Sequence, residues 1–177
     1  KGGFVTDGSR VYFLRRAGEQ SELAWVALTG GGTAPIHASW REPTVIGVSP
    51  NGLELLVRSQ VEMTAGTVPD AELWVLPVQG GTPRRVGDII AFDAAWVPDG
   101  NRLVYSKGPD AFLTTLDGVQ RRKLLSVPGG AWAFRWSPDG TRLRFAVRDL
   151  RTSSWAIWEA EPDGGKPHPL LPGWGNR

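Results

Sequence analysis

Apolar residues recur at every second position in short stretches along this chain, and turn-forming residues separate the stretches. Val11 and Phe13 form one such pair, and Leu103 and Tyr105 form another. Side chains two positions apart lie on the same face of a β-strand. No segment of about 10–12 residues keeps the period of an amphipathic helix. The hydrophobic pattern therefore predicts an all-β protein built from short, half-buried strands.

Four turn signals repeat along the chain at similar distances. Their glycines are 44, 48 and 40 residues apart, in the segments Thr6-Asp7-Gly8, Ser49-Pro50-Asn51-Gly52, Val97-Pro98-Asp99-Gly100 and Ser137-Pro138-Asp139-Gly140. Proline presets φ at the first corner of such a turn, and Asp or Asn followed by Gly tolerates the positive φ of a tight hairpin. A repeat of four strands has a period of about 40–45 residues. The spacing thus predicts four repeats, at approximately 1–40, 41–88, 89–128 and 129–172.

The segments between these turns agree in register. The second strand of each repeat carries an apolar pair after the glycine: Val11/Phe13, Leu55/Val57, Leu103/Tyr105 and Leu143/Phe145. We predict that Phe13, Tyr105 and Phe145 are buried at equivalent places. The third strand carries an aromatic residue at what looks like one equivalent position, in the order Trp25, Trp74, Phe112 and Trp158. Large aromatic residues that repeat in this way indicate packing between repeats, and we extend this prediction to Trp96 and Trp136.

The segment Trp136-Ser137-Pro138-Asp139-Gly140 resembles the repeat of TolB-like (WD40-like, PD40) β-propellers, and the other three turns depart from it at one to three positions each. The resemblance covers nearly the whole chain. It implies one β-propeller over 1–177, with four blade-length repeats of four antiparallel strands. Because propellers have about four to eight blades, we expect the chain to be part of a larger ring, or to self-associate to complete one.

Members of this family differ widely in function. They include TolB-like envelope components, propellers that gate prolyl-oligopeptidase-like serine peptidases, and bacterial regulators that join a winged-helix domain to a propeller. The closing segment Leu170-Leu171-Pro172-Gly173-Trp174 is most similar to the last group. The family resemblance implies a bacterial protein, either cytoplasmic or periplasmic.

Composition and charge narrow the function classes. The net charge is only +2, and a nucleic-acid footprint needs an excess of clustered basic residues, so we expect no nucleic-acid binding by this domain. No apolar run approaches the roughly 18 residues of a membrane span, so we expect no membrane insertion. The absence of cysteine excludes disulfides and thiolate metal sites.

Residues that could suggest catalysis fit structural roles better. Ser49 lacks the second glycine of a nucleophile elbow and occupies the repeated turn position. His37 and His168 are the two histidines and both stand in loops beside prolines. The aspartates at 7, 99 and 139 share one hairpin role. We therefore predict that the chain is not an enzyme, with no catalytic, cofactor-binding or metal-binding residues and no cofactor.

Arginine and tryptophan gather in the connections between second and third strands and between repeats, which open on one face of a propeller. These residue types are enriched at interface hot spots. We predict a partner-binding face made of Arg15, Arg16, Trp40, Arg41, Lys107, Trp132, Arg148, Arg151 and Trp155. The long connection 59–72 is a further candidate contact loop.

The leading functional hypothesis is a non-catalytic recognition or scaffolding module that binds a protein or small ligand through this loop-rich face. One alternative is an accessory, substrate-gating propeller of a serine peptidase whose catalytic domain lies elsewhere. Another is a TolB-like envelope component. The domains that flank the repeats in the complete protein would discriminate among these hypotheses.

Overall fold

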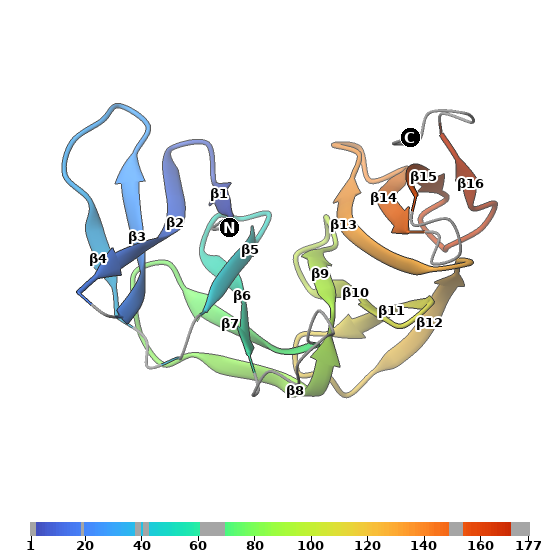
Figure 1. The fold of residues 1–177 in the computed structure, drawn as a ribbon, viewed down its shortest axis with the longest axis horizontal. Helices are drawn as coiled ribbons and strands as arrows, with labels where there is room; N and C mark the ends of the chain where they lie inside the picture. The colour runs from blue at the N-terminus through green and yellow to red at the C-terminus, as the bar shows by residue number, and fades with distance from the viewer. Residues whose placement is uncertain are drawn as a thin grey trace. The chain divides into compact units, whose positions relative to one another are not determined.

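The computed structural model describes residues 3–18, 20–37, 40, 43–60, 70–148 and 154–170, and every regular element in these ranges is a β-strand. The strands form four antiparallel sheets of four strands, each following chain order (Figure 1). Sheet A contains β1 (Phe4–Thr6), β2 (Arg10–Ala17), β3 (Gln20–Ala27) and β4 (Ala34–Ile36). Sheet B contains β5 (Thr44–Val48), β6 (Glu54–Gln60), β7 (Ala71–Pro77) and β8 (Arg84–Ala91).

Sheets C and D follow the same plan in the second half of the chain. Sheet C contains β9 (Asp93–Trp96), β10 (Arg102–Lys107), β11 (Asp110–Thr115) and β12 (Arg121–Ser126). Sheet D contains β13 (Gly130–Trp136), β14 (Leu143–Arg148), β15 (Trp155–Ala160) and β16 (His168–Pro169). The predicted all-β architecture of four-stranded repeats is confirmed. The described residues form no helix suited to crossing a membrane.

The connection expected at 59–72 is shorter than the sequence suggested. Strand β6 continues to Gln60 and β7 begins at Ala71, with Ser59 opposite Glu72 in the ladder. Residues 61–69, the rest of this candidate loop, lie outside the described residues.

A shared hydrogen-bond network closes the first hairpin of sheets B and D. In sheet D the Ser137 hydroxyl donates to Asp139 Oδ1 at 2.5 Å and accepts the Arg142 N–H at 2.9 Å. In sheet B the Ser49 hydroxyl donates to Asn51 Oδ1 at 2.7 Å and accepts the Glu54 N–H at 2.9 Å. These contacts confirm the turn role predicted for Ser49 and Asp139. Asn51 makes the same contact in sheet B that Asp139 makes in sheet D.

The hydrogen bonds around Asp139 predict a specific change in acid stability. The Ser137 hydroxyl, and then the Thr141 N–H and hydroxyl, lower the pKa of Asp139 from 3.8 to about 2. A carboxylate whose pKa falls on folding stabilises the fold above its unfolded pKa, and that stabilisation is lost as the pH falls through the folded pKa. We expect Asp139→Asn to keep the turn, as Asn51 does. Its melting temperature should fall less steeply than that of the wild type between about pH 4 and pH 2. Circular dichroism melts across this range measure the difference, and superimposable pH profiles would contradict it.

The chain divides into two compact units, and residues 1–90 form the first. Sheets A and B pack face to face within this unit. Sheet A contributes Tyr12 and Leu23 to their common core, and sheet B contributes Leu55, Val57 and Leu76, all of which are at most 2% exposed. Trp74 of sheet B packs against this core, and the Trp40 ring meets it edge to face with centroids 5.8 Å apart. The hydrophobic contact between neighbouring sheets thus holds the first unit together.

Residues 91–177 form the second unit, in which sheets C and D pack in the same way. Val104 and Leu113 of sheet C meet Leu143 and Phe145 of sheet D, and all four side chains are buried. Phe134 is fully buried in the same core, with its ring centroid 5.9 Å from that of Phe145. Trp136 and Trp158 pack against this cluster, as the repeat pattern predicted.

Two predictions about aromatic residues are wrong, the burial of Phe13 and the equivalence of Trp25, and each has its own cause. Tyr105 and Phe145 are buried, but Phe13 is only half-buried because no sheet of its unit covers that face of sheet A. Trp25 is not equivalent to Trp74 and Trp158. It lies opposite Tyr12, on the face of sheet A that packs on sheet B, where Arg10 stacks over its ring at 4.6 Å. Trp74 and Trp158 lie opposite Val57 and Phe145, whose positions correspond to Phe13 on the other face. Trp25 nevertheless packs against the core of the first unit, as its predicted role between repeats requires. A shift of one residue reverses the face of a strand residue.

A β-bulge in β13 sets which side chains of sheet D face the core. Trp132 pairs with Ala146 and Arg135 with Arg144, so β13 contains one residue more than β14 in this stretch. Ala133 takes a positive φ of 55° and donates its N–H to Asp93 Oδ2 at 2.5 Å. The bulge directs Phe134 into the core and leaves Trp132 on the opposite face.

Candidate functional site

The predicted partner-binding residues do not form a single cluster. Arg15 is held by Glu22 at 2.5 Å and by the Thr33 hydroxyl at 2.7 Å, while Arg16 is exposed near the end of β2. Trp40 is part of the packing in the first unit. Lys107 is exposed at the end of β10, and Arg41 and Arg151 lie outside the described residues. The role of all these residues in partner binding stays a prediction.

Three of the predicted residues share one face of sheet D. Arg148 and Trp155 lie opposite each other on β14 and β15, and Trp132 lies two positions along on the same face. Trp132 is 38% exposed and Trp155 is 41% exposed, so a large part of each indole is accessible to solvent. No carboxylate in the described part of the chain pairs with Arg148. The structure thus brings one guanidinium and two exposed indoles together on this face.

The Arg148–Trp155 pair is the last pair of the β14–β15 ladder, at the end where the two strands are connected. Because Phe145 and Trp158 are equivalent to Tyr105 and Phe112, counting along both strands aligns the pair with Gly108 and Pro109 of sheet C. Those two residues form the hairpin tip of sheet C. Arg148 and Trp155 therefore align with the hairpin tip of sheet C. They lie at the end of sheet D where the second strand connects to the third.

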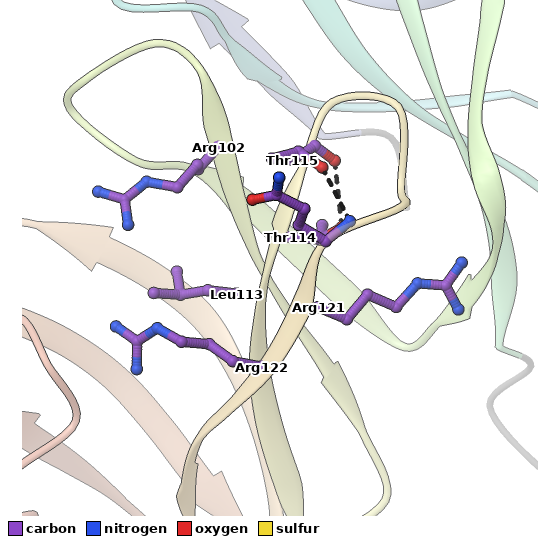
Figure 2. A pocket seen from close by; sticks show the side chains of 7 residues that line it. Arg102, Leu113, Thr114, Thr115, Arg121 and Arg122 are labelled. Atoms are coloured by element: carbon purple, nitrogen blue, oxygen red, sulfur yellow. Dashed lines mark hydrogen bonds between the residues drawn. The ribbon is translucent and has the colours of Figure 1, made fainter.

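Sequence reasoning did not select a second group of arginines, which lies at the opposite end of sheet C. A cavity of about 290 Å³ is lined by Arg102, Leu113, Thr114, Thr115, Gln120, Arg121 and Arg122 (Figure 2). The guanidinium groups of Arg102 and Arg122 flank Leu113, whereas Arg121 points away from them. Arg122 pairs with Leu113 across the ladder and Arg121 pairs with the next residue, so the two arginines occupy opposite faces.

Neighbouring carboxylates limit what this arginine group can bind. Arg102 pairs with Asp99 Oδ2 at 2.6 Å. Partial burial by itself would raise the pKa of Asp99, but hydrogen bonds from the Asn101 N–H and from Arg102 hold the pKa below its ordinary value. Asp99 and Asp163 also line the adjoining cavity of about 320 Å³. An anionic ligand would have to compete with Asp99 for Arg102, so the group is better suited to structure than to ligand capture.

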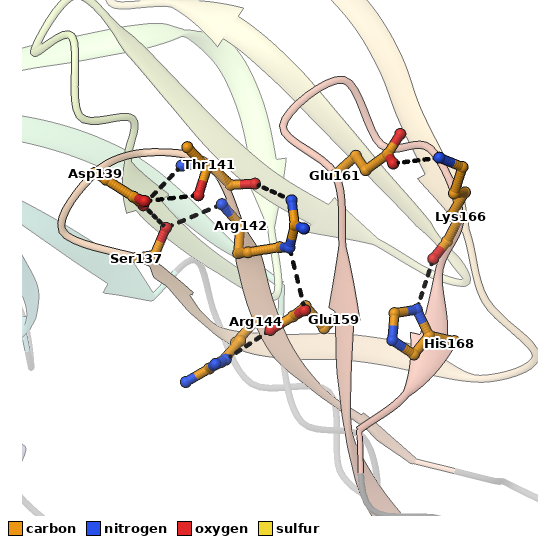
Figure 3. Close-up of polar contacts among 9 residues, drawn as sticks. All are labelled: Ser137, Asp139, Thr141, Arg142, Arg144, Glu159, Glu161, Lys166 and His168. Carbon is orange, nitrogen blue, oxygen red and sulfur yellow. Dashed lines mark hydrogen bonds and ion pairs between the residues drawn. The ribbon is translucent and has the colours of Figure 1, made fainter.

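Polar contacts on sheet D involve a carboxylate, Glu159, and a histidine, His168, which are side chains that a catalytic hypothesis would use (Figure 3). Glu159 is bridged by Arg144 at 2.9 Å and by Arg142 at 3.4 Å, which satisfies its charge. His168 is exposed on β16, and its Nδ1 lies 2.8 Å from the Lys166 carbonyl oxygen. His37 is also exposed, just after β4. The hydroxyl of Ser49 is engaged in the turn described above.

The described residues contain no group of three or more His, Cys, Asp or Glu side chains placed to hold a metal ion. Neither histidine contacts a serine or threonine hydroxyl in any of the described interactions. A nucleophile with a hydrogen-bonded base is the minimum arrangement for acyl transfer. The expectation that the chain is not an enzyme stays a prediction, which solution assays can test.

Four sheets of four antiparallel strands, packed face to face within each unit, define a β-propeller fold. The structure is similar to a TolB protein from Agrobacterium tumefaciens, with a TM-score of 0.78 and 17% identity over 96% of this chain and 64% of that chain. It is similar to TolB from Acinetobacter baumannii, with a TM-score of 0.77 and 14% identity over 97% of this chain and 43% of that chain. At such identities the likeness establishes the fold alone.

In two further comparisons the similar protein is a peptidase. The tricorn protease contains a similar region, with a TM-score of 0.60 and 13% identity over 97% of this chain and 18% of that chain. In sequence, 98 residues are 29% identical to the uncharacterized peptidase YuxL of Bacillus subtilis strain 168, covering 51% of this chain and 15% of that protein. No protein-family model matches the chain. The chain spans less than two thirds of each of these proteins.

Proposed function

We propose that this chain is a non-catalytic recognition module that binds a protein partner through the connection end of sheet D. The observation that carries the proposal is the exposed Arg148–Trp155 pair at the rim of the sheet. Arginine and tryptophan are the side chains that most often dominate binding energy at protein interfaces. A complementary surface would present a carboxylate to Arg148 beside an apolar group that covers the Trp155 indole.

The proposal is tested by site-specific photocrosslinking in living cells. A benzophenone amino acid replaces Trp155 in one variant, and replaces Val119 in a control variant. Val119 is 75% exposed in the turn before β12, at the opposite end of its sheet. We expect a discrete adduct with a second protein from position 155 and none from position 119. The Arg148→Ala substitution should weaken the adduct. Adducts only between copies of this chain, or none, would contradict the proposed function.

The non-catalytic part of the proposal has its own test. The purified chain is incubated with peptide, ester and lactone substrates, and each histidine and Ser49 is substituted in turn. We expect no hydrolysis above the buffer control. Hydrolysis that a single substitution abolishes would overturn this part of the proposal.

A second candidate function is the accessory propeller of a serine peptidase. The local similarity to the peptidase YuxL favours it. The complete polypeptide in its source organism discriminates the candidates. A downstream domain with a Gly-x-Ser-x-Gly elbow supports the peptidase role. An upstream winged helix supports a regulator, and an export signal supports a TolB-like envelope component.

A further inference from the structure

The cavity of about 320 Å³ in the second unit lies between sheets C and D, beside the first hairpin turns of both sheets. Two close approaches between the sheets border it. At the hairpin turns, a Cβ on Gly140 would lie 3.6 Å from Pro98 Cγ. At the turn before β16, a Cβ on Gly164 would overlap the Leu124 carbonyl oxygen of β12. Because both approaches are direct contacts between the sheets, they set the separation of the side chains that line the cavity.

Much of the lining is apolar. Val97 and Leu113 belong to the buried core between sheets C and D and also line the cavity. The Trp136 indole packs against that core and forms a further part of the lining. Its Nε1 atom is buried, and no residue in the described part of the chain accepts its N–H. An apolar lining with a few polar groups is typical of sites for small molecules.

Arg122 is the first of two charged side chains in this lining that no described residue neutralises. It forms no hydrogen bond or ion pair within the described ranges, and Figure 2 shows its guanidinium beside Leu113. Arg102, on the other side of Leu113, is already paired with Asp99. A guanidinium can donate two parallel hydrogen bonds to a carboxylate. Arg122 is therefore the arginine of this group that is available to a ligand carboxylate.

Asp163 is the second such side chain, and it belongs to sheet D. Its Oδ1 accepts the Gly165 N–H at 2.8 Å within the turn before β16. Among the described cations none forms an ion pair with Asp163, and the nearby Lys166 ammonium is held by Glu161 at 2.7 Å. This turn meets β12 at a position two residues beyond Arg122, and both charged side chains line the cavity. They do not pair with each other, so each is available to a ligand.

We propose that this cavity binds a zwitterionic ligand with an apolar group, the chemistry that apolar amino acids and short peptides share. The ligand carboxylate pairs with Arg122, the ligand ammonium pairs with Asp163, and the apolar group lies on Leu113 and Trp136. A purely anionic ligand is disfavoured, because two carboxylates also line the cavity and one of them already occupies Arg102. The volume is at the lower end of the range for small-molecule sites, roughly 300–1,000 Å³, so it suits one large side chain.

The proposed site is separate from the surface assigned to a protein partner. Arg148 and Trp155 lie where β14 connects to β15, whereas Gly140 and Asp163 belong to turns at the other end of sheet D. The proposal therefore stands independently of the proposed function. Loss of the photocrosslink from position 155 would leave it unaffected.

The indole N–H of Trp136 provides the readout of binding. L-Phenylalanine and L-alanyl-L-phenylalanine are titrated into the ¹⁵N-labelled chain, and the Trp136 signal is assigned from its loss in Trp136→Phe. We expect a saturable shift of this signal, with a dissociation constant on the order of 1 mM for a ligand of this size. The Trp96 indole N–H is the internal control. It is also buried without a described acceptor, but Trp96 lines neither cavity, so its signal should not move.

The two probes also distinguish the sources of this chemistry. Tighter binding of L-phenylalanine indicates a free amino acid as the ligand, and tighter binding of the dipeptide indicates a peptide. A Trp136 signal that shows no saturable shift with either probe would overturn the proposal.

Analogues that lack one charge test the two ion pairs separately. Each probe is compared with its amide, which lacks the carboxylate, and with its desamino form, which lacks the ammonium. We expect each analogue to bind about 10-fold more weakly or worse, the effect of losing a hydrogen bond between charged groups. Arg122→Gln should remove the preference for the acid over the amide. Asp163→Asn should remove the preference for the ammonium, while its oxygen still accepts the Gly165 N–H. Equal binding of the wild-type chain to a probe and either analogue would overturn the proposal.

Arg121→Gln is the matched control variant. Arg121 is adjacent to Arg122 on β12, and its substitution changes the net charge by the same amount. Its guanidinium points away from Leu113, and its Nε donates to the Gly118 carbonyl oxygen at 2.6 Å. We expect Arg121→Gln to change the dissociation constant by less than about twofold, because solvent screens a charge that does not contact the ligand. Arg122→Gln should raise it about 10-fold or more. Equal effects of the two substitutions would show a response to surface charge alone and would overturn the proposal.

Discussion

Replacing Gly164 by alanine should destabilise the second unit by about 3–5 kcal/mol. Gly164 has a φ of +89° in the turn between β15 and β16, a region that residues with a Cβ rarely occupy. A Cβ at this position would also stand 2.1 Å from the Leu124 carbonyl oxygen on β12. The obstacle is backbone of the adjacent sheet, so sheets C and D would have to separate to accommodate the methyl group. Chemical denaturation followed by circular dichroism measures the loss.

Gly80 offers a matched control for this prediction. It occupies the equivalent turn of sheet B with a φ of +85°, and a Cβ there would meet no atom within 4 Å. Gly80→Ala should therefore cost only the conformational strain, about 1–2 kcal/mol. The difference between the two variants isolates the steric conflict with Leu124. Equal losses of stability would show that the close approach of sheets C and D at Gly164 is not as described.

Removing the carboxylate of Asp93 should destabilise the second unit by about 1.5–3 kcal/mol. Asp93 Oδ2 accepts the N–H of Ala133, which the bulge has withdrawn from the β13–β14 ladder. In Asp93→Ala this N–H loses its acceptor while Ala133 keeps a strained positive φ. The amide hydrogen of Ala133 should then exchange with solvent much faster. Denaturation and residue-resolved hydrogen exchange measure the two effects.

Asp93→Asn separates the hydrogen bond from other consequences of the substitution. The asparagine side chain retains an oxygen acceptor of nearly the same shape, although without the charge. We expect it to recover more than half of the stability and most of the protection of the Ala133 N–H. If Asp93→Ala left that amide protected, the bulge would be held by something other than this carboxylate.

Local sequence signals predicted the strands and turns because their causes lie within a few residues. The Ser49–Asn51 and Ser137–Asp139 turns are built from side chains that bond to backbone groups two to five positions away. Glycines at Gly52 and Gly140 supply the positive φ values that these hairpins require. Such interactions depend only on residues that are close together in the sequence, so a repeated motif forms the same interactions in each of these repeats.

The candidate surfaces were predicted only in part, because cross-strand contact depends on register. The sequence selected Trp132, Arg148 and Trp155 as residues of one loop-rich side, and the structure brings them to one face of sheet D. It gave no indication that Ile157 would join them. Arg102 and Arg122 are 20 positions apart in the sequence and line one cavity on either side of Leu113, where no local pattern connects them.

The sequence by itself determined the all-β class, the four repeats and the chemistry of their turns. The tertiary structure decided which side chains face a neighbouring sheet. Phe13 follows the same pattern as Phe145, yet it is only half-buried because burial depends on an adjacent sheet that this unit does not supply. Trp132 faces outward because a bulge adds one residue to β13, and a carboxylate 40 positions earlier holds that bulge. Packing between sheets is a long-range property, which a period of two along one strand cannot encode.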